Sequence, residues 1–134
     1  FAGFSATALR SRIDDAQAKL VVTVDGQWRR GAAAPIKTAV DESVAGAESV
    51  QNVLVVNRTG IDVDWTDGRD LWWHETVAQA SPEHEAQAFD AEHPLFILYT
   101  SGTTGKPKGI IHTSGGYLTQ ASYTHHNVFD HKAG

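Results

Sequence analysis

Short apolar runs alternate with helical patterns along this chain, and this alternation limits the possible folds more than any other feature. The runs at residues 20–24 and 50–56 have the length and composition of buried strands. A third run, residues 95–99, has no polar alternation, which is typical of a strand covered on both faces. Strands separated by helices favour an α/β fold with a mostly parallel sheet flanked by helices.

Four helices are expected before, between and after these strands. Ser5 is a suitable N-cap for a helix over residues 6–18, whose apolar residues recur at helical spacing. Pro35 suits the first turn of a second helix. A short helix is expected within residues 71–80, and a closing helix over residues 115–128. The remaining segments are expected to be turns or surface loops: residues 25–26, 57–70 and 81–92.

Composition narrows the functional classes. The chain has 134 residues, a net charge of -5 and no cysteine. Without cysteine there are no disulfides, no thiolate catalysis and no cysteine-ligated metal. The negative charge argues against a nucleic-acid surface, no apolar stretch approaches the roughly 20 residues that cross a bilayer, and no secretory signal is visible. We therefore expect a cytoplasmic protein that binds neither nucleic acid nor membrane.

The first residue, Phe1, and the lack of methionine predict that the chain is a piece of a longer protein, although processing would produce the same absence. The length of 134 residues is within the usual range of a single domain.

The segment YTSGTTGKPKG, residues 99–109, directly follows the third apolar run and has the composition of a phosphate-binding loop. Glycines let the main chain approach a ligand closely, and successive backbone N–H groups in such turns converge on anions. Hydroxyl donors and lysines add further favourable contacts. The residues expected to bind the phosphates are Thr100, Ser101, Gly102, Thr103, Thr104, Gly105, Lys106, Lys108 and Gly109.

This segment is not a Walker A loop. A Walker A loop has four residues between its glycines and then Lys followed by Ser or Thr, whereas two residues separate Gly102 from Gly105 here. Pro107 supplies no N–H and biases Lys106 away from the α region, so a helix opening at this point is not expected. The phosphate must be held in another way.

The same segment resembles the phosphate-loop signature of the adenylate-forming enzymes, which include acyl-CoA synthetases, luciferases and peptide-synthetase adenylation domains. Four neighbouring segments make the chain similar to the AMP-forming acetyl-CoA synthetases: FAGFS, DWTDGRDLWW, ASPEHEAQAFDAEHPLFILYTSG and GIIHTSGGYL, at residues 1–5, 64–73, 80–102 and 109–118. The resemblance implies that residues 1–134 are part of the large N-terminal AMP-binding domain of a much longer enzyme.

The resemblance also implies a reaction. Acetate attacks the α-phosphorus of Mg-ATP to give acetyl-AMP and pyrophosphate, and the thiol of CoA then displaces AMP. The family's loop contacts the β- and γ-phosphates, with Lys108 as the main cation here. The acetate and adenine pockets, the Mg²⁺ ligand and the catalytic lysine of the family lie beyond Gly134, so the chain is expected to need the rest of the enzyme and to be inactive alone, with no catalytic residue of its own.

A CoA-binding role follows from the resemblance for one further segment. Family members place an arginine-containing segment near the 3′-phosphate of CoA, and WRRGAAAPIK, residues 28–37, occupies that place. Arg29 matches the first arginine, with help from Arg30. Many members have a second basic residue where this chain has Ala32.

Several alternatives stay open at this stage. The glycine-rich loop could be a flexible connector, and Arg29 and Arg30 could form a solvated surface. Another short-chain acyl-CoA synthetase, such as one for propionate, and a non-catalytic phosphate- or nucleotide-binding module also fit the residues.

The tryptophans of residues 65–73 are interpreted as packing. His112, His125, His126 and His131 include no pair at i, i+4 spacing, so we predict no metal site.

Overall fold

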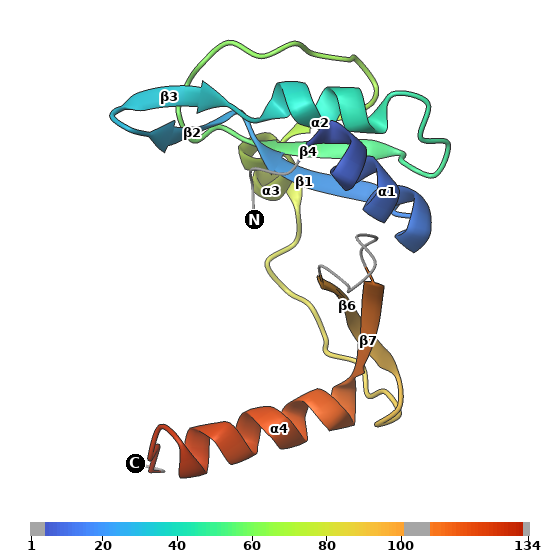
Figure 1. Ribbon diagram of the computed structural model, residues 1–134, viewed down its shortest axis with the longest axis vertical. Helices are drawn as coiled ribbons and strands as arrows, with labels where there is room; N and C mark the ends of the chain where they lie inside the picture. The colour runs from blue at the N-terminus through green and yellow to red at the C-terminus, as the bar shows by residue number, and fades with distance from the viewer. Residues whose placement is uncertain (1–4, 101–107, 133–134) are drawn as a thin grey trace. The chain divides into compact units, whose positions relative to one another are not determined.

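The computed structural model describes residues 5–100 and 108–132. The chain divides into two compact units, Phe1–Pro82 and Glu83–Gly134 (Figure 1). In the described part of the chain, no helix has both the length and the apolar character needed to cross a membrane.

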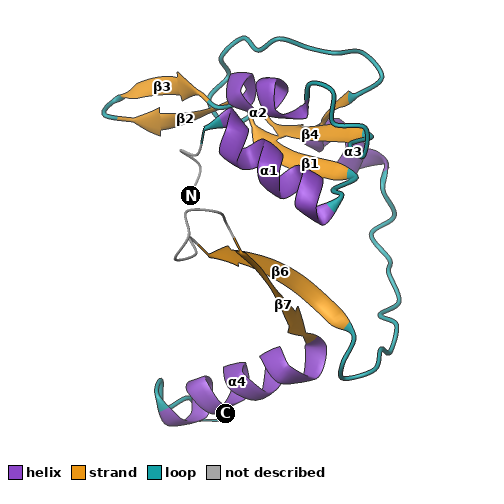
Figure 2. Cartoon of the chain, turned by 45° about the vertical axis from the view of Figure 1, so that its right-hand side comes forward, coloured by secondary structure: helices purple, strands orange, loops and turns teal. Residues whose placement is uncertain are grey.

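A three-stranded parallel sheet forms the centre of the first unit. Its strands are β1 (Leu20–Val24), β4 (Asn52–Val56) and β5 (Asp70–Trp72), in the order β1-β4-β5. Figure 2 shows β1 and β4 side by side. Strand β1 runs parallel to β4 with Leu20 opposite Asn52, and β4 runs parallel to β5. The expected α/β fold with a mostly parallel sheet is confirmed, as are the strands at residues 20–24 and 50–56.

Three helices flank this sheet: α1 (Ala6–Ala16), α2 (Lys37–Val44) and α3 (Trp73–Gln79). The N-cap predicted at Ser5 is confirmed, because its Oγ accepts from the backbone N–H of Ala8 at 3.3 Å. Helices α1 and α2 pack together and share a buried core with β4, and α2 also contacts β1, whereas α3 packs against β4 and β5. The buried core comes from α1, α2, the segment after α2, and β4: Ile13, Val40, Val44, Ala47, Val53 and Val55.

An antiparallel hairpin that the sequence analysis did not predict extends from this unit. It consists of β2 (Gly26–Arg29) and β3 (Ala32–Pro35). Strand β1 ends at Val24 and the chain bends at the fully buried Asp25, as predicted, but the turn does not include Gly26, which already pairs with Pro35 in the hairpin. The chain reverses instead at residues 30–31, and then enters α2 (Figure 1).

The second unit is a β-hairpin followed by a helix. Strand β6 (Pro94–Thr100) pairs antiparallel with β7 (Lys108–Thr113), and α4 (Ser114–Asn127) follows directly. An aromatic group joins the helix to the hairpin, because Phe96 stacks on His112 at 4.6 Å between ring centroids and meets the ring of Tyr117 edge-on at 5.0 Å. The predicted strand at residues 95–99 and helix at residues 115–128 are confirmed.

The surroundings of β6 differ from the prediction. Its described neighbour is antiparallel, and Leu95 and Leu98 are 50% and 54% exposed, so the strand is not covered on both faces. Covering a strand on both faces takes a layer of structure on each side. The described residues of this unit provide one helix, α4, beside the hairpin. An apolar run predicts that a strand can be buried, but its neighbours decide whether it is.

Candidate functional site

The predicted phosphate loop connects the two strands of the β6–β7 hairpin. Thr100 is the register partner of Lys108, and Tyr99 is the partner of Gly109. These pairs bring both ends of the loop together at the same end of the hairpin. The predicted contacts Ser101, Gly102, Thr103, Thr104, Gly105 and Lys106 lie outside the described residues.

A strand, not a helix, follows the loop. Strand β7 begins at Lys108, in agreement with the exclusion of a Walker A loop, which opens a helix. The exposed Lys108 therefore stands at the start of a strand, with its backbone fixed by pairing with Thr100. Strand β7 was not predicted, although the β-branched residues of GIIHT were a signal for it.

Close packing between the two strands explains why residue 109 is a glycine, which the sequence alone did not reveal. A Cβ at this position would lie 2.9 Å from Cγ2 of Ile97 and 3.1 Å from the ring of Tyr99. The Tyr99 ring thus lies across the backbone of the opposite strand. Glycine at position 109 permits this close cross-strand packing directly below the loop.

Arg29 and Arg30, which the sequence analysis treated as a pair, occupy different places. Arg29 ends β2 and pairs with Ala32 across the hairpin. Arg30 and Gly31 form the two-residue turn, with φ of 52° and 81°, the positive values typical of a tight hairpin turn. Directly opposed residues share one face of a hairpin. The partner of Arg29 is Ala32, so this pair carries a single positive charge.

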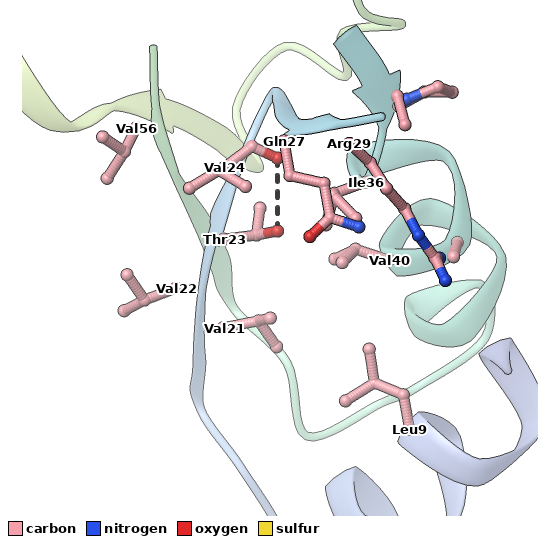
Figure 3. Close-up of a pocket in the computed structure, with 13 residues that line it drawn as sticks. Leu9, Val21, Val22, Thr23, Val24, Gln27, Arg29, Ile36, Val40 and Val56 are labelled. Carbon is pink, nitrogen blue, oxygen red and sulfur yellow. Dashed lines mark hydrogen bonds between the residues drawn. The ribbon is translucent and has the colours of Figure 1, made fainter. Parts of the chain in front are cut away.

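Arg29 also lines an apolar pocket of the first unit. The pocket has a volume of about 600 Å³ and lies among α1, β1, α2 and the β2–β3 hairpin. Leu9, Val21 and Val40 contribute apolar walls, and Figure 3 shows the side chains of Gln27 and Arg29 reaching to the same side as Val40. Arg30 is not part of this lining. An apolar pocket with a guanidinium at its edge suits a ligand with an apolar body and an anionic group.

Asp25 joins the base of this hairpin to the rest of the unit. Its carboxylate accepts from the backbone N–H groups of Arg58 at 2.8 Å and Gly60 at 2.7 Å. Thr59 donates both its N–H, at 3.0 Å, and its hydroxyl, at 2.8 Å. Burial by itself raises the pKa of the Asp25 carboxyl, but the hydrogen bonds from Arg58 and Thr59 outweigh this effect and hold the pKa far below its usual range. The sequence analysis missed this role.

A second group of buried charges connects α2 with β5. The Nζ of Lys37 lies 2.7 Å from Oδ2 of Asp70 and 2.9 Å from the carboxylate of Asp41. The Nε of Arg69 lies 2.6 Å from Oδ1 of Asp70. Burial alone raises the pKa of Asp70, but hydrogen bonds from Arg69 and Lys37 leave it lowered. Each charge faces an opposite one, so we interpret this group as structural. Its only sequence signal was the i, i+4 spacing of Lys37 and Asp41.

Two of the three tryptophans of residues 65–73, Trp65 and Trp72, pack as expected. Trp65 and Trp72 stack with 4.6 Å between ring centroids, and Nζ of Lys37 lies 5.7 Å from the Trp65 ring centre. Trp73 is 43% exposed. The Trp65 ring, with Trp72 stacked on it, therefore covers the edge of the buried charges. Among residues 5–100 and 108–132, no three His, Asp or Glu side chains gather as a metal site.

Relatives of known name cover nearly the whole chain. An acetyl-coenzyme A synthetase of Mycolicibacterium smegmatis is 76% identical over 132 residues, which are 98% of this chain and 14% of that protein. Proteins of the same name from Streptomyces avermitilis and Salmonella typhi are 67% and 51% identical, and the matches cover 98% and 100% of this chain. The chain spans 20% and 21% of their lengths.

A solved structure is also similar. The acetoacetyl-CoA synthetase from Streptomyces lividans matches 98% of this chain with a TM-score of 0.83 and 29% identity, over 20% of its own length. The family described as AMP-binding enzyme matches residues 1–133. With almost every residue matched, the chain belongs to the AMP-binding enzyme family.

Proposed function

We propose that this chain is part of an AMP-forming acetate:CoA ligase and lies in the large N-terminal domain of that enzyme. The observation that carries the proposal is the 76% identity, over 98% of the chain, to a protein described as an acetyl-coenzyme A synthetase. Acetate is favoured over a larger acyl group because the relative named for acetoacetate is only 29% identical. The enzyme is proposed to act in the cytoplasm on acetate, ATP and CoA.

The two proposed steps use different parts of this chain. In the first, a carboxylate oxygen of acetate bonds to the α-phosphorus of ATP as the bond to pyrophosphate breaks. In the second, the CoA sulfur bonds to the acetyl carbon, and AMP leaves with the electrons of the broken C–O bond. The loop between Thr100 and Lys108 is proposed to hold the β- and γ-phosphates during the first step only, because pyrophosphate has left before the second. The Mg²⁺ that accompanies ATP is proposed to be held by residues outside this chain.

Arg29 is proposed to serve the second step by binding the 3′-phosphate of CoA. Its place at the edge of an apolar pocket supports this role, because the guanidinium is presented at the end of a hairpin strand beside a surface that accepts an apolar group. A guanidinium binds phosphate oxygens through charge-assisted hydrogen bonds. Arg30, in the turn, is proposed only as a source of nearby positive charge.

The test uses the full-length protein that contains this segment, identified by the intact mass of the natural product. Acetate-dependent exchange between ATP and pyrophosphate, followed by CoA-dependent thioester formation, is the expected result. Propionate and acetoacetate should give weaker exchange than acetate. A full-length protein that binds ATP but shows no exchange with any of the three acids would be a non-catalytic nucleotide-binding module. The isolated 134-residue chain should show no exchange.

A further inference from the structure

The β2–β3 hairpin depends on its base for its direction. It is a two-stranded sheet by itself, joined to the three-stranded sheet by the chain and not by strand pairing. An isolated two-stranded hairpin is only marginally stable in water. Arg29 is at the far end of β2, opposite Ala32 and next to the turn. Any change of angle at the base of the hairpin therefore displaces the guanidinium.

The backbone of Asp25 holds both ends of the hairpin. Its N–H donates to the carbonyl of Val56 at 3.1 Å, which extends the pairing of β1 with β4 by one residue. Its carbonyl accepts from the N–H groups of Ile36 at 3.0 Å and Lys37 at 3.3 Å, which follow the end of β3. The segment that enters the hairpin is thus bonded to the segment that leaves it.

The carboxylate of Asp25 holds the neighbouring turn against the same base. It accepts from residues 58–60, as described above, and Gly60 has a φ of 75°. This turn packs tightly on the hairpin, because a Cβ at Gly26 would lie 2.7 Å from Cδ1 of Ile61 and 2.7 Å from Oγ1 of Thr59. The turn therefore acts as a support for the first residue of β2.

A carboxylate is required for this set of contacts. Oδ1 accepts from Arg58, while Oδ2 accepts from Thr59 and Gly60, and both oxygens are fully buried. Asparagine has one acceptor oxygen and one donor NH₂. The NH₂ group would face a backbone N–H of the turn, and that buried N–H would lose its partner at a cost in free energy.

We propose that Asp25 is a positioning residue that orients the β2–β3 hairpin and thereby places Arg29 at the pocket for the 3′-phosphate of CoA. This proposal rests on the proposed function of Arg29. Asp25 does not touch the ligand; it acts through the hairpin base and the turn at residues 58–60.

The experiment uses the full-length protein that contains this segment. Asp25→Asn, Arg29→Ala and the double variant are compared by their KM for CoA at saturating acetate and ATP. Asp25→Asn should raise KM by about threefold to tenfold, with acetate-dependent pyrophosphate exchange unchanged. Arg29→Ala should raise KM by about tenfold or more. The double variant should resemble Arg29→Ala alone, because a guanidinium that is absent cannot be misplaced.

Other variants keep the test decisive. Thr59→Val removes one hydroxyl donor to Asp25 and keeps the backbone donors, so it is the milder variant to use if Asp25→Asn folds poorly. It should raise the KM for CoA, but less than Asp25→Asn does. The exposed Asp62 provides the matched control, since Asp62→Asn removes one charge near the same turn and should leave KM unchanged.

The outcomes separate the two proposals. The positioning role would be overturned if the effects of Asp25→Asn and Arg29→Ala on the KM for CoA multiplied in the double variant. It would also be overturned if Asp25→Asn weakened both half-reactions equally. Either outcome would leave the role of Arg29 intact. An unchanged KM for CoA in Arg29→Ala would overturn the CoA-binding role of Arg29, and the positioning role with it.

Discussion

The ammonium of Lys37 and the carboxylate of Asp70 lie 2.7 Å apart, and both side chains are almost completely buried. They are separated by 33 positions in the sequence, yet their contact ties α2 to β5. Arg69 and Asp41 complete the group, so that each buried charge faces an opposite one. Buried ion pairs of this kind are costly to break, because removal of one partner leaves the other uncompensated.

The substitution Lys37→Met should therefore destabilise the chain by about 1.5 to 3 kcal/mol, because the buried Asp70 loses one of its two cationic partners and keeps Arg69. Urea unfolding followed by tryptophan fluorescence measures the change, since Trp65 lies beside Lys37. Lys132→Met, in an exposed ion pair with Asp130, is the matched control and should change the unfolding free energy little. Similar effects of the two substitutions would contradict the structural role of the buried group.

Acid should destabilise the fold through Asp25 and Asp70. The pKa of each carboxyl is lower in the folded state than its ordinary value, so the unfolded chain binds protons that the folded chain does not. The stabilisation is fully present above the unfolded pKa of about 4 and is lost as the pH falls below it. Unfolding free energies measured from pH 7 to pH 3 should show this decline, and the difference between wild type and Asp25→Asn should shrink with falling pH. A difference that stays constant would exclude the contribution of Asp25.

Lys108→Ala in the full-length protein should weaken the first half-reaction more than the second. Lys108 is at the base of the loop, opposite Thr100, and its proposed contact is with phosphates that leave as pyrophosphate. Acetate-dependent pyrophosphate exchange measures the first step, and CoA transfer from supplied acetyl-AMP measures the second. If both fell equally, a folding defect would explain the result better than a lost phosphate contact.

Arg29→Ala in the same protein should give the opposite pattern. Pyrophosphate exchange should remain, while the KM for CoA should rise about tenfold or more, as expected for the loss of a charge-assisted contact to phosphate. Arg30→Ala is the matched control, because Arg30 is in the turn and does not line the pocket. It should change KM less than Arg29→Ala does. Equal effects would mean that only the net charge of the hairpin matters.

Local sequence signals determined the longer elements of this protein. The apolar runs of β1, β4 and β6 predicted strands, the Ser5 cap and the apolar spacing after it predicted α1, and the pattern after residue 114 predicted α4. The family was also recognisable from the residues of the loop segment and its neighbours, and the match of residues 1–133 to the AMP-binding enzyme family confirms that resemblance. In each case the information lies within a few consecutive residues, where periodicity and capping act.

Only the tertiary structure decided the remaining features. The strands β2, β3, β5 and β7 were not predicted, because β2, β3 and β5 are short, AAAP has little strand preference of its own, and all four form through pairing with a partner. Asp25 looked like a turn residue, yet donors 33 to 35 positions away bury it and set the base of the Arg29 hairpin. The partners of Lys37 are equally distant, apart from Asp41. Contacts of this kind depend on which segments the fold brings together, and no local pattern encodes them.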